Sequence, residues 1–257
     1  MKVSDVLVVL QAMAPFETAM DFDNVGLLIG DPDRPVDAVL VALDATPAAV
    51  RAARQAGAQL LLTHHPVLLA PRKDLRTDDP EGALLHRIIR EDLCLAAMHT
   101  NWDAAAGGVN DALLAALGFD TAAADGMLRA ADLPTPMPLT DLAARVERRL
   151  GDAVRCCAAS DAPVSRLAVC GGAGGNLWPQ AKALGADCLL VGECRYHHAL
   201  DAVSMGLHVL EAGHWATEQP GALALAQGLQ SRLHALQYDV RVVCMNQAPF
   251  GRRVKAY

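Results

Sequence analysis

Short apolar runs that alternate with alanine-rich stretches are the feature of this 257-residue sequence that most limits its fold. Residues 36–43, 60–62 and 93–98 have the length and apolar content of buried strands, and helical patterns near 46–57 and 82–91 lie between them. A strand–helix–strand order with buried strands is typical of α/β proteins. We therefore expect an α/β fold.

The second half of the sequence repeats this order. Strand patterns at 166–170 and 187–191 flank a helical pattern at 178–184, and Gly185-Ala186 follows Gly57-Ala58 at an offset of 128 residues. The same offset aligns the strands of the two halves without a gap. We interpret the repeat as an internal duplication; the alternative is that any two strand–helix–strand units look alike.

A proline-rich stretch separates the two halves. Residues 133–138 read Leu-Pro-Thr-Pro-Met-Pro, and alternating prolines exclude both a helix and an interior strand. We expect a linker here, near the boundary between a first lobe of residues 1–130 and a second lobe of residues 131–257.

The charge balance limits the class of partner. Lys and Arg number 22 and Asp and Glu number 29, which gives a formal net charge of −7. A surface of this sign argues against nucleic-acid binding. A local basic patch of Arg145, Arg148, Arg149 and Arg155 is the exception, and we interpret it as a solvated helix face.

Cysteine count and hydropathy bear on the compartment. The number of cysteines, seven, is odd and no Cys-x-x-Cys occurs, which favours free thiols over a disulfide scaffold or a zinc ribbon. The longest apolar runs are far shorter than the roughly 18 residues of a membrane-spanning helix, and the N-terminus shows no export signal. We expect a cytoplasmic protein that does not enter membranes.

Polar residues gather where the predicted strands end. Six of the nine histidines lie in four such clusters, and ligands of open α/β sheets bind at the carboxyl ends of the strands. The clusters are Thr63-His64-His65-Pro66, His99-Thr100-Asn101-Trp102-Asp103, Gly192-Glu193 with Tyr196-His197-His198, and Gly213-His214-Trp215-Ala216-Thr217-Glu218.

Within these clusters, imidazoles and carboxylates form a chemically sensible set for a pair of divalent ions such as Zn, Mn, Fe, Co or Ni. His214 and Glu218 share one face of a helix, and a carboxylate can bridge two ions. The candidate ligands are His64, His65, Asp103, His214 and Glu218. The alternatives are that the adjacent histidines form an ordinary loop pair, that the His-x-x-x-Glu spacing arises by chance, and that Asp103 only caps a helix.

The glycine-rich loop at 171–175 follows a predicted strand and precedes a predicted helix. Its backbone N–H groups are suited to an anion, and a tight turn for close packing is the alternative. The loop is not a Walker loop, because no Gly-Lys-Ser/Thr follows it.

Several of these motifs, in this order, resemble the GTP cyclohydrolase I type 2 proteins, also called the Nif-three-like family. Asp21-Phe22-Asp23-Asn24-Val25-Gly26-Leu27 resembles the family's Trp-Asp-Asn-x-Gly-Leu signature, with Phe22 in place of Trp. The His-His-Pro element, the His-Thr-x-x-Asp element, the Gly-Gly-x-Asn element at 107–110 and the Gly-His-x-x-Thr-Glu element also have counterparts here.

The resemblance implies two similar, intertwined α/β lobes with a dinuclear metal centre between them and a toroidal homohexamer. It also implies metal ligation by the five candidate residues, hence two divalent ions per chain. Longer relatives carry an inserted middle domain, for which this chain is too short, so we expect one compact unit.

The resemblance and the metal chemistry together suggest a function. Paired dications suit hydrolysis of a small nucleotide-like or phosphorylated substrate, and the family name implies ring opening of GTP. In such a hydrolase Glu193, His197 or His99 would move protons, or would instead orient a ligand. The alternative is a non-catalytic metal-binding scaffold or partner-binding protein.

Overall fold

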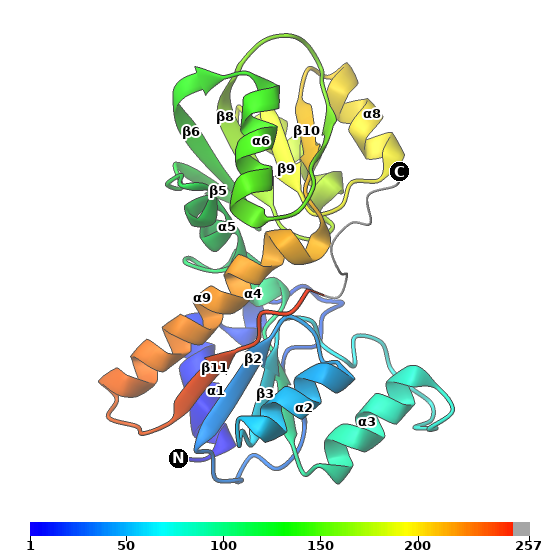
Figure 1. Ribbon diagram of the computed structural model, residues 1–257, viewed down its shortest axis with the longest axis vertical. Coiled ribbons are helices and arrows are strands. Elements are labelled where there is room, and N and C mark those ends of the chain that lie inside the picture. The colour runs from blue at the N-terminus through cyan, green and yellow to red at the C-terminus, as the bar shows by residue number, and fades with distance from the viewer. Residues whose placement is uncertain (249–257) are drawn as a thin grey trace. The chain divides into compact units, whose positions relative to one another are not determined.

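The computed structural model of the chain describes residues 1–248, in which strands and helices alternate (Figure 1). The strands are β1 (Gly26–Ile29), β2 (Ala38–Ala42), β3 (Leu60–Thr63), β4 (Cys94–Ala97), β5 (Ala123–Asp125), β6 (Leu128–Met137), β7 (Arg155–Cys157), β8 (Val164–Cys170), β9 (Cys188–Val191), β10 (His208–Glu211) and β11 (Arg241–Cys244). The α-helices are α1 (Val3–Met13), α2 (Pro47–Gln55), α3 (Pro80–Arg90), α4 (Thr100–Ala104), α5 (Val109–Leu117), α6 (Leu139–Leu150), α7 (Trp178–Ala183), α8 (Tyr196–Ser204) and α9 (His214–Ala235). The predicted α/β fold is confirmed.

The chain forms two compact units. The first contains Met1–Leu113 and Pro220–Met245, and the second contains Leu114–Gln219 together with residues 246–248. The chain leaves the second unit within α9 and ends that helix in the first. The predicted lobes divide the chain once, at residue 130, whereas each compact unit contains two segments.

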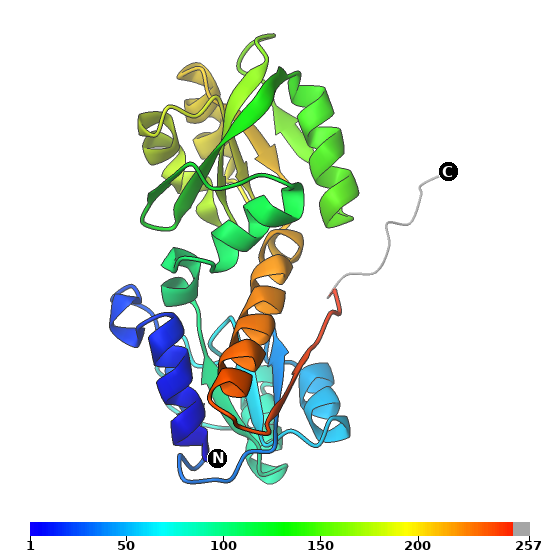
Figure 2. The same cartoon turned by 90° about the vertical axis from the view of Figure 1, so that its left-hand side faces the viewer.

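The sheet of the first unit has the strand order β1-β4-β3-β2-β11. Strands β11, β2, β3 and β4 are parallel, and β1 pairs with β4 in the antiparallel direction. Helix α1 and the later turns of α9 pack on one face, where Leu10 and Leu229 share a buried cluster with Leu60 and Leu62. Helices α2 and α3 cover the other face (Figure 2).

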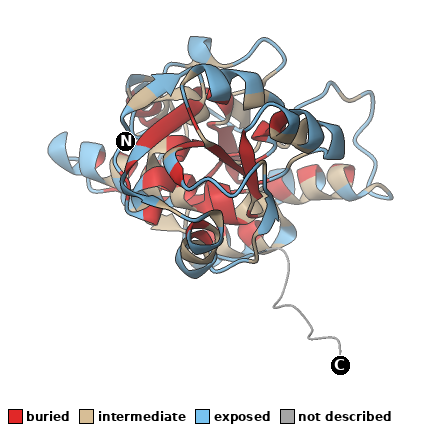
Figure 3. Ribbon diagram, turned by 90° about the horizontal axis from the view of Figure 1, so that it is seen from above, coloured by how far each residue is buried: buried red, intermediate tan, exposed pale blue. Residues whose placement is uncertain are grey.

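Burial on both faces explains the continuous apolar runs in the sequence. Successive side chains of a strand point to opposite faces, so Leu60 and Leu62 enter the cluster under α1 while Leu61 enters the cluster under α2. All three leucines are fully buried. Figure 3 shows buried residues along the strands and exposed residues along the outer sides of the helices. A parallel sheet covered on both faces requires this pattern.

The sheet of the second unit has the order β5-β6-β8-β9-β10-β7. Strands β8, β9 and β10 are parallel, and β6 and β7 flank them in the antiparallel direction. Helices α7 and α8 cover one face, where Ala181 and Ala202 pack with Leu189 and Val191. Helix α6 lies over the other face (Figure 1).

The prediction of a linker at 133–138 is wrong. Residues 133–137 belong to β6, and Pro138 precedes α6. The strand tolerates its prolines because β5 pairs only with its first three residues, Leu128–Ala130, and the pairing with β8 is irregular between Asp132 and Met137. The prolines therefore lie where a strand edge needs no backbone donor.

The structure also bears on the cysteines and on membrane-spanning helices. All seven cysteines are free thiols in the structure. Along residues 1–248, no helix has the length and apolar content needed to cross a bilayer.

Candidate metal-binding groups at the strand ends

The histidine pair of the first unit lies directly after β3. His64 is fully buried and the His65 side chain is one-quarter exposed. The Thr63 hydroxyl donates to the carbonyl of His65 over 2.8 Å, which turns the chain at the strand end. The two rings are 4.9 Å apart between centroids, with an angle of 51° between their planes. The two rings therefore diverge modestly where the strand turns into a loop.

His99 joins this pair from the neighbouring strand end. It stands between β4 and α4, and its ring centroid is 5.2 Å from that of His64 and 5.5 Å from that of His65. Each of the three histidines offers a ring nitrogen within 4.8 Å of the others. Parallel pairing of β3 with β4 brings these residues together, because both strands end at the same edge of the sheet.

Hydrogen bonds fix the orientation of all three rings. The Nδ1 atoms of His64, His65 and His99 each lie 2.8 Å from an oxygen, and the respective acceptors are the Met98 carbonyl, Asp44 Oδ1 and Asp23 Oδ1. A carbonyl or carboxylate oxygen accepts, so each Nδ1 carries a proton, and in the neutral form of such a ring Nε2 is the nitrogen with the lone pair. Histidines that bind metals are held in this way.

The surroundings of Asp23 favour its ionised form. Burial opposes its charge, but hydrogen bonds from His99 and from the backbone and hydroxyl groups of Thr100 outweigh that effect and hold the pKa of this carboxyl below its usual range. Asp23 therefore stays ionised and keeps the His99 proton on Nδ1.

Asp103 lies inside α4 and does not cap it. His99 occupies the cap position, which excludes the alternative reading of Asp103 as a capping residue. Oδ1 of Asp103 is 3.5 Å from Nε2 of His64, and the Asp103 side chain is 13% exposed. This distance suits two ligands of one ion, so the structure brings Asp103 to the histidine group.

The second unit carries a smaller group at the start of α9. His214 and Glu218 are one helical turn apart, and Nε2 of His214 lies 3.1 Å from Oε2 of Glu218. Glu218 is buried, with 4% exposure. The predicted common helix face is confirmed.

Glu193 contacts His214 at Nδ1, the ring nitrogen that does not face Glu218. Its Oε1 lies 3.1 Å from Nδ1 of His214, and its side chain is largely exposed. The carboxylate directs the Nε2 atom of His214 toward Glu218. This geometry favours the orienting role that we considered for Glu193.

The glycine-rich loop packs against the same group. A Cβ atom on Gly172 would lie 2.1 Å from Oε1 of Glu218, and the φ angle of Gly172 is +62°. The Gly172 N–H donates to the Thr217 hydroxyl over 3.1 Å, and its carbonyl accepts from Glu193 N–H over 2.7 Å. Of the two alternatives, an anion-binding loop and a tight turn for close packing, these contacts favour the tight turn.

Two further sets of predicted residues lie apart from these groups. His197 is exposed on α8 and contacts the Tyr196 ring, with 5.5 Å between centroids, and among residues 1–248 it joins no cluster of potential metal ligands. In the basic patch, Arg145 donates to the Leu117 carbonyl and stacks on Phe119, while Arg155 pairs with Glu211.

Two residues that orient these histidines, Asp44 and Asp23, were not predicted from the sequence. Asp44 follows β2 and Asp23 belongs to the N-terminal motif, so strand-end position pointed to the first and motif membership to the second. Their partners His65 and His99 are 21 and 76 residues away along the chain, which no local pattern reveals.

The two groups fit divalent metal. The first offers three imidazoles and one carboxylate, and the second offers an imidazole and a buried carboxylate. Nitrogen and oxygen ligands of this kind suit Zn, Mn, Fe, Co and Ni alike. The set lacks a thiolate, so nothing in it selects one of these ions.

Comparisons with known proteins find relatives that match nearly the whole chain. A relative from Clostridium perfringens, named GTP cyclohydrolase 1 type 2 homolog, is 32% identical over 96% of this chain and 97% of its own length. One of the same name from Streptomyces coelicolor is 34% identical over 94% and 90%. The crystal structure of Staphylococcus aureus hypothetical protein SA1388 superposes with a TM-score of 0.92 at 28% identity, over 98% of this chain and 99% of that one.

The family model of Duf34/NIF3 (NGG1p interacting factor 3) matches residues 1–249, which is nearly the whole chain. Together with full-length relatives above 30% identity, this match shows that the chain belongs to the Duf34/NIF3 family.

Proposed function

We propose that this protein is a metal-dependent hydrolase that holds two divalent ions and acts on a small nucleotide-like or phosphorylated molecule. The proposed protein ligands are His64, His65 and Asp103 of the first unit and His214 and Glu218 of the second.

The observation that carries the proposal is the shared orientation of the imidazoles. In four histidines at strand ends, an oxygen acceptor holds Nδ1, and histidines that bind metals through the other ring nitrogen are oriented in this way. A histidine that only fills space in a core needs a hydrogen bond for its polar nitrogen, but several such histidines need not share one orientation. The carboxylates of Asp103 and Glu218 add the negative charge that neighbouring dications require.

The chain's own residues divide the work. Divalent ions in such a site lower the pKa of water and polarise a carbonyl or phosphoryl oxygen. His99 is not among the proposed ligands, and Asp23 holds its ring in place. We assign it the movement of a proton. Glu193 positions His214, and His197 has no contact that gives it a part.

The names of the relatives support a hydrolytic reading. Two full-length relatives are named for GTP cyclohydrolase 1 type 2, a ring-opening activity on a nucleotide. We extend that substrate class to this chain, together with assembly as a homohexamer and a cytoplasmic location.

The test is turnover that depends on metal. Protein purified without chelator is analysed for bound ions, stripped, and reloaded with Zn, Mn, Fe, Co or Ni. Each form is then assayed with GTP and a panel of phosphate esters. We expect activity to disappear on stripping and to return with at least one ion. About two bound ions with no turnover of any compound would contradict the hydrolase and favour a metal-binding scaffold.

A further inference from the structure

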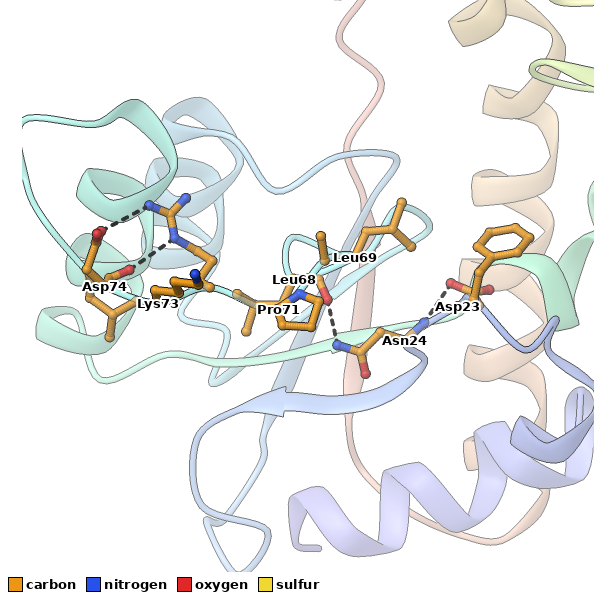
Figure 4. A pocket seen from close by; sticks show the side chains of 11 residues that line it. Asp23, Asn24, Leu68, Leu69, Pro71, Lys73 and Asp74 are labelled. Atoms are coloured by element: carbon orange, nitrogen blue, oxygen red, sulfur yellow. Dashed lines mark hydrogen bonds and ion pairs between the residues drawn. The ribbon is translucent and has the colours of Figure 1, made fainter.

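A pocket of about 630 Å³ opens in the first unit, beside the histidine group. Two segments line it, Phe22–Asn24 ahead of β1 and Leu68–Leu75 after β3 (Figure 4). Its volume lies in the range of small-molecule sites. None of the proposed metal ligands is part of its wall.

Hydrogen bonds connect the two walls. The Asn24 side-chain amide donates to the Leu68 carbonyl over 2.6 Å, and Asn24 N–H donates to Oδ1 of Asp23 over 2.8 Å. Figure 4 shows Asn24 between Asp23 and Leu68. Arg72 is held by Asp79 and by Glu81, the latter at 2.7 Å. These hydrogen bonds and ion pairs therefore hold the lining of the pocket in place.

Besides the carboxylates of Asp23 and Asp74, the lining offers two kinds of contact to a ligand. Phe22 is 60% exposed, and Leu69 and Leu75 are 46% and 48% exposed, so an aromatic ring and aliphatic side chains face the open space. The charge of Arg72 is balanced by acids, whereas no carboxylate among residues 1–248 lies within 4 Å of the Lys73 ammonium group. An accessible ring and an uncompensated cation suit a flat molecule that carries an anionic group.

Asp23 links this pocket to the reacting residues. It forms part of the pocket wall and also accepts the hydrogen bond from His99. The other wall continues the chain directly from His65 through Pro66. A molecule in the pocket thus lies against residues that position the histidine group.

We propose that this pocket binds the substrate of the proposed hydrolase, with Phe22 stacked on a planar heterocycle and Lys73 paired with a phosphate or similar anion. That the bound molecule is a substrate rests on the proposed function, but its binding in the pocket does not require turnover.

Three probes separate the two contacts. Guanosine 5′-monophosphate carries ring and phosphate, guanosine carries the ring alone, and ribose 5-phosphate carries the phosphate alone. Calorimetric titration of the metal-loaded protein gives each affinity. Phe22→Ala should weaken both ring-bearing probes by about tenfold or more, because base stacking contributes about that much, while Phe22→Trp should retain their affinity.

Lys73→Ala should weaken the two phosphate-bearing probes severalfold and leave guanosine unaffected, and Lys73→Arg should restore the loss. Ile89→Ala is the matched control, because Ile89 is 55% exposed in the same unit but outside the pocket. Metal content, measured in every variant, should stay constant.

Failure of this inference is distinguishable from failure of the hydrolase proposal. Unchanged affinities in Phe22→Ala and Lys73→Ala, or no binding of the monophosphate to the wild-type protein, would overturn the pocket assignment even if metal-dependent turnover is found. Affinities that fall as predicted in a protein without turnover would support the pocket and contradict only the hydrolase.

Discussion

The parallel strands of the two units pair in the same register, yet the residues that follow them differ in charge. Val39 of β2 lies opposite Leu60 of β3, and Leu167 of β8 lies opposite Cys188 of β9, so both partners of the second pair stand 128 residues after those of the first. This register matches the sequence offset. An internal duplication stays a prediction, because similar strand–helix–strand units also arise independently.

At the strand ends the likeness stops. His64-His65 follows β3, whereas Gly192-Glu193 follows β9 at the same offset. The first unit thus collects three imidazoles and the carboxylate of Asp103, and the second places two carboxylates around a single imidazole, that of His214. The comparison teaches that a common sheet fixes where ligands stand, while the residues after each strand decide what they are.

Removal of one proposed ligand from each unit tests whether both units are needed. His64→Ala and Glu218→Ala should each remove most of the bound metal, because each deletes a ligand from a small set. Elemental analysis of the purified variants measures this, with His234→Ala, an exposed histidine of α9, as control. Full metal content in Glu218→Ala would confine the ligands to the first unit.

Close packing of the glycine loop should matter in the second unit. Gly172→Ala places a Cβ atom against the Glu218 carboxylate in a left-handed backbone, so we expect a loss of roughly 3 kcal/mol or more in unfolding free energy, together with reduced metal content. Denaturant unfolding measures the first effect.

Gly126→Ala is the matched control, with a φ of +55° and no atom within 4 Å of the added Cβ. It should cost only about 1–2 kcal/mol. Equal losses for the two variants would show that contact with Glu218 is unimportant.

The acceptors behind the histidines allow a direct comparison between the units. Asp44→Asn acts on His65 and Glu193→Gln acts on His214, and each should weaken metal affinity by about 10- to 100-fold. Competition with a chromogenic chelator measures the affinity. If neither substitution changes it, the hydrogen bonds to Nδ1 do not organise the ligands.

The smallest expected effect concerns pH. The folded-state pKa of Asp23 is lowered, so its ionised form stabilises the fold above the unfolded-state value of about 4, and this contribution is lost as pH falls toward the lowered pKa. Metal-free wild type should be more stable than Asp23→Asn by about 1–3 kcal/mol at pH 7. That gap should narrow below pH 4 in urea unfolding, and a gap that is constant with pH would contradict the assignment.

Local patterns carried much of the fold and part of the site. Thr46 caps α2 through Ala49 N–H, and the His214–Glu218 spacing places both on one helix face, because capping and helical periodicity involve only near neighbours. The return of α9 to the first unit and the acceptors Asp23 and Asp44 depend on tertiary packing between distant segments. The strand at 133–137 was missed because its prolines are tolerated only where β5 is absent.

The central proposal is that the five residues His64, His65, Asp103, His214 and Glu218 bind a pair of metal ions. Anomalous diffraction from crystals of the metal-loaded protein, recorded at the absorption edge of the bound element, tests it most directly. We predict two peaks per chain, in contact with Nε2 of His64, His65 and His214 and with the carboxylates of Asp103 and Glu218. A single peak, or peaks that touch residues of one unit alone, would contradict the account.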